Sequence, residues 1–185
     1  MKDYSKYYNL EKYLTEEVSK KFSKQGYLDA FDFFCIVIWK ANRAKSKIAK
    51  RICELSTKKN IKDGCKELTT GIRKKDNKQE RLNYLLNHWQ FRLPMASAIL
   101  TILYPKDFTV YDVRVCRELS KYKGLYSKSN NRIIEDYFDF VEDVKRLVQE
   151  YSSLRDKDRY LWGKSFSKDL NNDIGHDFIK NNCGR

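Results

Sequence analysis

The sequence predicts an all-α fold, a compact multi-helix bundle, for two reasons. Only seven Gly and two Pro interrupt the 185 residues, and the long stretches between them repeat their apolar residues about every 3.6 positions, as α-helices do. Hydrophobic residues make up 41% of the chain, which is enough for a core and excludes a disordered basic tail. Because no repeat or low-complexity linker divides the chain, we expect one domain over 1–185. The alternative is two lobes, with 1–60 and 131–185 packed against a central lobe 61–130.

The N-terminal half of the chain predicts three helices and a basic loop. A first helix spans 6–24 and stops before Gly26, since glycine commonly follows a helix C-terminus. A second, long helix covers 29–56. Its apolar face consists of Phe34, Val37, Ile38, Ala41, Ile48 and Ile52. A third, short helix at 63–73 leads into the basic loop 73–78.

The C-terminal half predicts five more helices, at 79–89, 95–103, 113–119, 131–151 and 156–162. The helix at 95–103 is built of apolar and small residues, and the turn Pro105-Lys106-Asp107 follows it. A β-branched and aromatic run then leads to Asp112 and the next helix. The helix at 131–151 carries an apolar stripe made of Ile134, Phe138, Val141, Val144 and Val148. We expect the polar tail after Lys164 to be poorly ordered or loosely packed.

The charge balance favours a polyanionic partner. Lys and Arg number 38 against 25 Asp and Glu, which gives a net charge of +13 and a sequence pI of about 9.4. Such an excess is typical of proteins that bind nucleic acid or an anionic membrane surface; the alternative is a soluble protein that is merely basic. No stretch approaches the roughly 18 consecutive apolar residues of a membrane span, and the N-terminus lacks the apolar run of a signal peptide. We therefore expect a cytoplasmic protein.

The cysteines predict neither a metal site nor a disulfide. There are five, an odd number, and no two have CxxC spacing. They are Cys35, Cys53, Cys65, Cys116 and Cys183. Cys35 lies in an apolar run, so we expect it to be a buried free thiol. We expect the protein to act without a metal or another cofactor.

The predicted helix 29–56 carries the densest positive charge. Lys40, Lys47 and Arg51 are spaced by seven and four residues, which places them on one helical face, with Arg43 beside them. Such a face can hold nucleic-acid phosphates, and the affinity would then fall steeply with salt. The alternative is an ordinary solvated helix surface.

Asp112 stands at the start of a helix, with apolar sequence on both sides. Aspartate is among the best N-cap residues, so a structural role alone would explain it. The other interpretation is a catalytic carboxylate at the floor of a cleft. An extended approach over 108–111 and the small residues at 96–98 favour the cleft, because small residues allow close backbone approach. Arg114 and Arg117 add positive charge just past the acid.

Several segments around this acid resemble the core of the helix-hairpin-helix DNA glycosylase superfamily. The matching residues are Leu93-Pro94, Ala96-Ser97-Ala98-Ile99-Leu100, Pro105 and Val110-Tyr111-Asp112-Val113-Arg114-Val115. The segments 38–43 and 154–162 are similar to those of a bacterial branch of this superfamily. The resemblance implies a helical bundle of the same type, in which an aspartate begins a helix and faces the extruded base. Asp112 falls on that position.

The chain departs from this superfamily at two places. The family hairpin reads Gly-hydrophobic-Gly, which lets backbone amides approach a phosphate; the matching positions here are Gln90, Phe91 and Arg92. Arg92 would replace that device by a direct ionic contact. Pro94 stands where bifunctional members carry a lysine nucleophile, and proline cannot form a Schiff base, so strand cleavage through that position is excluded. The expected DNA-contacting residues are Lys40, Arg43, Lys47, Arg51, Gln90, Arg92 and Arg114.

Four aromatic residues are candidates to line a base pocket, namely Trp39, Trp89, Tyr111 and Trp162. The alternative for each is a place in the core. Asp158 and Arg159 form a polar pair in otherwise apolar sequence. We expect them to be structural, either by bonding Arg114 across the cleft or by capping the last helix, because buried charges are normally paired. The alternative is a role near the site.

The sequence therefore predicts a DNA-binding protein, and specifically a monofunctional DNA glycosylase. It would flip a base out of double-stranded DNA and cleave its N-glycosidic bond with Asp112, as the first step of base excision repair. The alternative is a non-catalytic nucleic-acid-binding module that keeps the fold without the reaction. A third hypothesis is a protein-interaction or defence factor whose basic face binds RNA or an acidic protein.

Overall fold

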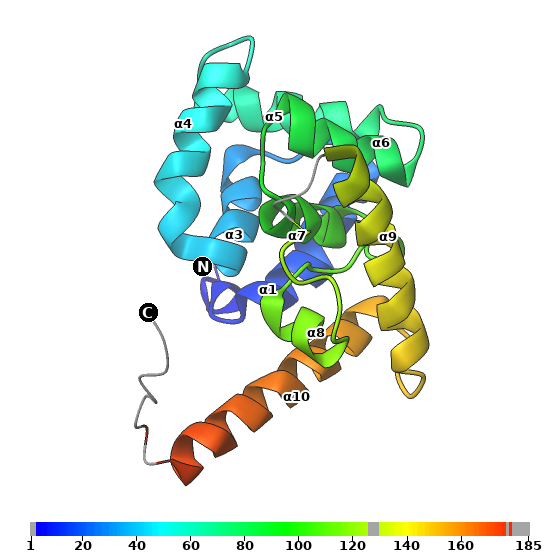
Figure 1. Ribbon diagram of the computed structural model, residues 1–185. Coiled ribbons are helices and arrows are strands. Elements are labelled where there is room, and N and C mark those ends of the chain that lie inside the picture. Colours follow the sequence, from blue (N-terminus) through cyan, green and yellow to red (C-terminus); the bar gives the residue numbers. More distant parts are fainter. Residues whose placement is uncertain (1–2, 126–129, 177, 179–185) are drawn as a thin grey trace.

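The computed structural model describes residues 3–125, 130–176 and 178 (Figure 1). Its α-helices are α1 Leu10–Tyr13, α2 Ser19–Gln25, α3 Ala30–Ala41, α4 Lys45–Leu55, α5 Ile61–Arg73, α6 Lys78–Asn83, α7 Leu93–Leu103, α8 Val113–Glu118, α9 Asn130–Leu147 and α10 Leu154–Gly175. Shorter 3-10 and π-helical segments are η1 Ser5–Tyr7, η2 Leu14–Val18, η3 Asn42–Ala44 and η4 Tyr84–His88. The described residues contain no strand, which confirms the predicted all-α class. None of the helices described is both long enough and apolar enough to cross a lipid bilayer.

Most helix starts follow from a side chain that accepts a backbone N–H. Such an acceptor satisfies one of the amide groups that the first turn of a helix leaves unpaired. The capping residues are Asn9, Asp29, Asn60, Asn77, Asp112 and Ser153. At the other end of α2, Gly26 adopts the left-handed conformation with φ 78°, as the sequence predicts.

The prediction of a single helix over 29–56 is wrong. Ala41 leaves the helical conformation (φ −161°, ψ 79°), and η3 turns the chain before α4 begins. α4 then runs back beside α3 towards α5 (Figure 1). The turn allows close packing of α4 on α5, where Ile52 is fully buried against Gly64. Burial of this apolar face offsets the loss of helix continuity.

Replacing Gly64 by alanine should destabilise the protein, although alanine is the better helix former. An added Cβ would lie 2.5 Å from Ile52 Cγ2 and 3.2 Å from the Ser56 side chain, so the two helices would have to separate. We expect the free energy of unfolding, measured with urea, to fall by about 1–3 kcal/mol. Gly163→Ala in α10 is the matched control, because a Cβ there meets no atom within 4 Å. That change should stabilise the protein by about 0.5–1 kcal/mol; equal effects at the two sites would contradict the packing argument.

α7 lies in the middle of the molecule (Figure 1), and each of its residues except Pro94 is buried. It packs against α2, α3 and α6. The largest fully buried aromatic side chains belong to the same core and are Phe22, Phe33, Trp89, Phe108, Tyr137 and Phe140. The loop that carries Asp112 therefore packs on a buried helix.

The expected end of the last helix at 162 is also wrong, and so is poor order directly after Lys164, because α10 continues to Gly175. This long helix lies at one end of the bundle and packs along α8 (Figure 1). Leu161 and Ser165 are buried in the contact. Ion pairs across it are Lys164–Glu118, Lys168–Glu118, Arg114–Asp169 and Arg117–Asp169. The charged side chains of this polar sequence thus hold α10 against α8 through ion pairs. Positions 177 and 179–185 of the tail lie outside the described residues.

Cys35 is buried as predicted, and its burial raises the pKa of the thiol to about 11. Cys183 lies outside the described residues. Among the residues that the structure places, no three His, Cys, Asp or Glu side chains converge in the way a metal ion would require.

Candidate functional site

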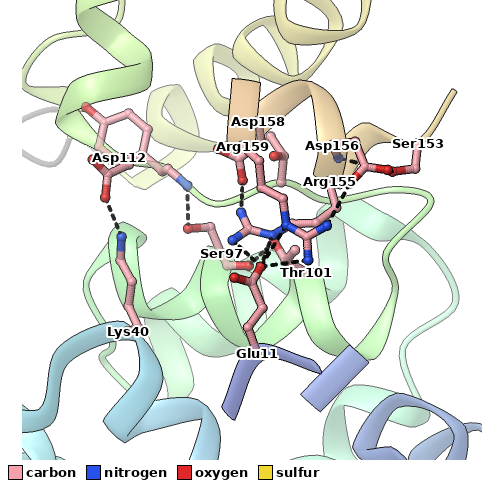
Figure 2. Close-up of polar contacts among 12 residues, drawn as sticks. Glu11, Lys40, Ser97, Thr101, Asp112, Ser153, Arg155, Asp156, Asp158 and Arg159 are labelled. Atoms are coloured by element: carbon pink, nitrogen blue, oxygen red, sulfur yellow. Dashed lines mark hydrogen bonds and ion pairs between the residues drawn. The ribbon is translucent and has the colours of Figure 1, made fainter. Parts of the chain in front are cut away.

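A pocket of about 390 Å³ lies where α1, α3, α10 and the segment before α8 meet. We name it the Asp112 pocket. Its lining residues are Glu11, Trp39, Lys40, Val110, Asp112, Arg155, Asp158, Arg159 and Trp162. Figure 2 shows the charged side chains of this set reaching towards one another from different helices. The pocket is therefore built by parts of the chain that are far apart in the sequence.

Asp112 both caps α8 and lines this pocket. Its Oδ1 accepts a hydrogen bond from the Arg114 backbone N–H at 3.1 Å, and its Oδ2 accepts one from Lys40 Nζ at 2.8 Å (Figure 2). Burial by itself would raise the pKa of the Asp112 carboxyl, but the Lys40 ammonium and the Arg114 N–H outweigh it and hold that pKa below its usual value. The side chain remains 23% exposed. The pocket thus contains an ionised carboxylate that solvent can reach.

The segment that delivers Asp112 is fixed by two buried hydroxyl groups. Ser97 Oγ, on α7, accepts the Tyr111 backbone N–H at 2.9 Å. Tyr137, on α9, donates its hydroxyl proton to the Thr109 carbonyl at 2.7 Å and accepts the Thr109 N–H at 3.2 Å. Because Ala96 and Ala98 flank Ser97 and are fully buried, the segment lies close against α7. The small residues of this helix therefore allow the close backbone approach that the sequence predicts, and the segment held there ends at Asp112.

A charge network forms the wall opposite Asp112. Arg155 is paired with the buried carboxyl of Asp158, and its Nε and Nη2 donate to Glu11 Oε1 at 2.8 and 2.6 Å. Arg159 Nε also donates to Glu11, at 3.1 Å (Figure 2). The Arg155 guanidinium lies 5.1 Å from the centre of the Trp39 ring. Burial raises the pKa of Asp158 against the opposing charge of Arg155, so the two aspartates of the pocket are shifted in opposite directions.

The expected partners of Asp158 and Arg159 were partly wrong. Asp158 pairs with Arg155 and not with Arg114, whose guanidinium is held by Asp169 at 2.6 Å. The cap of α10 is Ser153. Arg159 bonds Glu11 and Asp156. Asp158 and Arg159 both line the Asp112 pocket, so both lie near the candidate site as well as in structural contacts.

A second hollow of about 360 Å³ lies beside the Asp112 pocket, and Lys40 lines both. We name it the cationic hollow. Its lining residues are Lys40, Ala41, Ala44, Lys47, Ile48, Arg51, Gln90, Arg92, Pro94 and Met95. Five of the seven predicted DNA-contacting residues therefore meet here, although the continuous helix from which three of them were inferred does not exist. The five residues come together because α4 folds back and lies beside the turn that precedes α7.

Gln90 adopts the left-handed backbone conformation, with φ 51°. Its carbonyl accepts a hydrogen bond from the Arg51 guanidinium. Glycine adopts this conformation without strain, whereas other residues rarely do. Gln90 therefore adopts a backbone conformation that glycine usually provides in turns, although it carries a side chain.

The other two predicted DNA contacts lie elsewhere. Arg43 is exposed in η3 and does not line the cationic hollow. Arg114 is 27% exposed and paired with Asp169, and its guanidinium lies over the rings of Trp162 and Phe166.

The four aromatic candidates separate into three environments. Trp39 and Trp162 line the Asp112 pocket. Trp89 is fully buried in the core against Tyr84 and is not part of the pocket. Tyr111 is buried, and its hydroxyl donates to the Tyr122 carbonyl at 2.6 Å. It lines a smaller hollow on the other side of Asp112. Only the two exposed or half-buried indoles can therefore face a ligand in the pocket.

Glu11 and Arg155 belong to the site but do not stand out in the sequence. They are 144 residues apart, so no local pattern connects them. The one available signal is the spacing of Arg155 and Asp158, three positions apart on a helix, at which side chains meet.

The Lys40 charge should control the ionisation of Asp112. Because the folded-state pKa of Asp112 is lowered, its charge contributes stability above the ordinary carboxyl pKa, and this is lost as the pH falls through the lowered value. In Lys40→Met the burial effect is no longer outweighed by the neighbouring ammonium, so we expect the Asp112 pKa to rise and this window to move to higher pH. NMR titration of ¹³C-labelled aspartate measures it. Lys45→Met, which removes an exposed lysine bonded to Asn42, should leave the pKa unchanged; an unchanged value in Lys40→Met would contradict the assignment.

Comparison of the chain with protein-family models, with curated proteins and with solved structures gave no match. Its class is therefore defined by the fold and the site themselves. It is an all-α protein in which a helix-capping carboxylate lies in a pocket beside a cation-lined hollow.

Proposed function

We propose that this protein binds DNA and excises a base, as a monofunctional DNA glycosylase of the helix-hairpin-helix type with Asp112 as its catalytic carboxylate. The observation that carries the proposal is an ionised carboxylate at a helix N-terminus inside a pocket with two indole walls. An enzyme that acts on a base needs such a pocket, because the target nucleotide has to leave the stack. The volume of about 390 Å³ is within the range of pockets that enclose small organic ligands.

The chemistry follows from the charge of Asp112. When the glycosidic bond breaks, its electron pair leaves with the base and positive charge develops on the sugar. A carboxylate with a lowered pKa is negative at neutral pH, so it can stabilise that charge or orient the attacking water. The water oxygen then bonds to C1′ and loses a proton, which the departed base takes up in place of its bond to the sugar. Trp39 and Trp162 provide flat apolar walls for the extruded base.

The cationic hollow would hold the DNA backbone near the pocket. Lys47 and Arg92 are exposed, and Arg51 is half-buried and fixed by its bond to Gln90. Positive side chains of this kind bind phosphates and release condensed counterions, so binding weakens as salt increases. Arg92→Ala should reduce the slope of log affinity against log salt by about 1. Lys20→Ala, an exposed lysine of α2 that lines neither hollow, should not.

Base release from a panel of modified and mismatched duplexes tests the proposed activity. The wild-type protein should release the base from at least one member of the panel, with both DNA strands left intact because Pro94 offers no amine. A protein that binds every member of the panel and releases nothing would contradict the proposal.

The second candidate is a nucleic-acid-binding module without catalysis. The observation that favours it is that both Asp112 oxygens already accept hydrogen bonds, one from the α8 backbone and one from Lys40. Salt-dependent binding without base release would support this candidate. Comparison of duplex DNA, single-stranded DNA and RNA in the same assay would then identify the partner, because RNA is recognised mainly through unpaired bases and its 2′-hydroxyls.

A further inference from the structure

α10 presents two parallel aromatic rings to solvent beside the Asp112 pocket. Trp162 and Phe166 are four residues apart, their ring centres are 5.5 Å apart, and the ring planes differ by 9°. Their side chains are 42% and 43% exposed. Trp162 also lines the pocket. The stack therefore begins at the pocket wall and continues outward along the helix.

Arg114 fixes this pair from the α8 side. Its guanidinium lies 5.3 Å from the Trp162 ring centre and 5.4 Å from that of Phe166. The same guanidinium is held by Asp169 at 2.6 Å. A cation within about 6 Å of an aromatic ring attracts it. The rings are thus held in place in the free protein and need little reorganisation to bind a flat ligand.

We propose that Trp162 and Phe166 form a stacking platform for an unpaired nucleotide, so that the protein binds single-stranded or locally opened nucleic acid next to the Asp112 pocket. Every nucleobase has a flat face that stacks on an aromatic side chain. The inference rests on the proposed function in one respect, namely that the partner is nucleic acid. It adds that the partner has unpaired bases outside the pocket as well as inside it.

The charge of the protein selects this occupant over others. The apolar surface of α10 continues with Leu170 and Ile174, which are 39% and 55% exposed, so a protein partner or a second copy is the competing occupant. A second copy would bring together two chains that each carry a net charge of +13, whereas a polyanion is attracted to both. The cationic hollow adjoins the Asp112 pocket through Lys40, and Trp162 lines that pocket, so positive charge lies near the platform.

The test is a titration of the full chain with a single-stranded thymidine oligonucleotide at low salt, followed by tryptophan fluorescence. Bases that stack on Trp162 should quench its emission, while the fully buried Trp89 is shielded.

Trp162→Ala and Phe166→Ala should each weaken single-strand binding about tenfold, in the range that base–aromatic stacking gives. In Phe166→Ala, whose ring does not line the Asp112 pocket, affinity for a fully paired duplex should change less than about twofold. Binding in the variants is measured by fluorescence anisotropy of a labelled oligonucleotide, so that the loss of a tryptophan does not remove the signal.

Tyr160→Ala is the matched control, because Tyr160 lies on the same helix with 43% exposure but packs against Tyr151 instead. Wild-type affinity in the Trp162 and Phe166 variants would overturn the platform. An equal loss of single-strand affinity in Leu170→Ala would also overturn the platform. So would a concentration-dependent dimer in sedimentation that Leu170→Ala abolishes, because either result assigns this face of α10 to another occupant. Base release by Asp112 is measured separately. Release from duplexes without single-strand binding would refute the platform alone, and single-strand binding without release would refute the glycosylase alone.

Discussion

Asp112→Asn should abolish base release, with a loss of at least about 100-fold in the single-turnover rate, while DNA binding persists. The amide has the shape of the carboxylate but carries no charge, so it cannot stabilise positive charge on the sugar. Asparagine is as good an N-cap as aspartate, so the hydrogen bond to the Arg114 N–H and the start of α8 should survive. The measurement is base release from the most reactive duplex of the panel, with anisotropy for binding and circular dichroism for helix content.

A control for this substitution is available on the same loop. Asp107→Asn makes the same chemical change in the turn after α7, and Asp107 does not line the Asp112 pocket. It should release base at the wild-type rate. A fully active Asp112→Asn protein would remove Asp112 from the chemistry and leave it as a helix cap.

Arg155→Met should cost about 3–5 kcal/mol in the free energy of unfolding at neutral pH, because it leaves the buried Asp158 charge without its partner. The variant also loses the hydrogen bonds from Arg155 to Glu11. Burial already raises the pKa of Asp158, and without Arg155 the rise should be greater. A carboxyl whose folded-state pKa is raised destabilises the protein as the pH increases from its unfolded pKa towards its folded one. The cost should therefore shrink as the pH is lowered and Asp158 takes up a proton.

Urea unfolding of Arg155→Met at pH 7 and at pH 5 measures that difference. The double variant Arg155→Met with Asp158→Asn removes both charges, and should recover a substantial part of the stability lost at pH 7. A loss that is the same at both pH values and in the double variant would mean that Arg155 acts through packing on Trp39 and through Glu11 instead.

The features that could be predicted from the sequence were the local ones. Helical periodicity predicts the all-α class, and the starts expected at 29 and 79 lie within one residue of the starts of α3 and α6, which Asp29 and Asn77 cap. The turn at Ala41 could not be predicted, because the apolar period continues through it and no glycine or proline interrupts it. The length of α10 was underestimated because its outer half is polar, and ion pairs to α8 are invisible in a hydrophobic pattern.

The same distinction between local and long-range information applies to the site. Asp112 was identified from its place between an apolar run and a helix, which is local information. Its partner Lys40 is 72 residues away, and only the contact between α3 and the α8 start brings the two together. The charge network opposite Asp112 depends on Glu11 and Arg155, and no single segment of the chain contains both. The sequence therefore predicted the carboxylate and two aromatic residues of the pocket, Trp39 and Trp162, but not Glu11 and Arg155.

The separation of Glu11 and Arg155 has a consequence for the time at which the pocket comes into existence. The chain is made from its N-terminus, and domains commonly form their structure as units during or after synthesis. α7 and its neighbours can assemble once the residues before α8 have emerged, but one wall of the pocket belongs to α10. Contacts between distant segments also form late, because closing a long loop costs entropy before the contact returns any energy. A nascent chain that stops before Leu154 would therefore contain the Asp112 carboxylate and α7 but no enclosed pocket, so that the site is completed only when α10 packs.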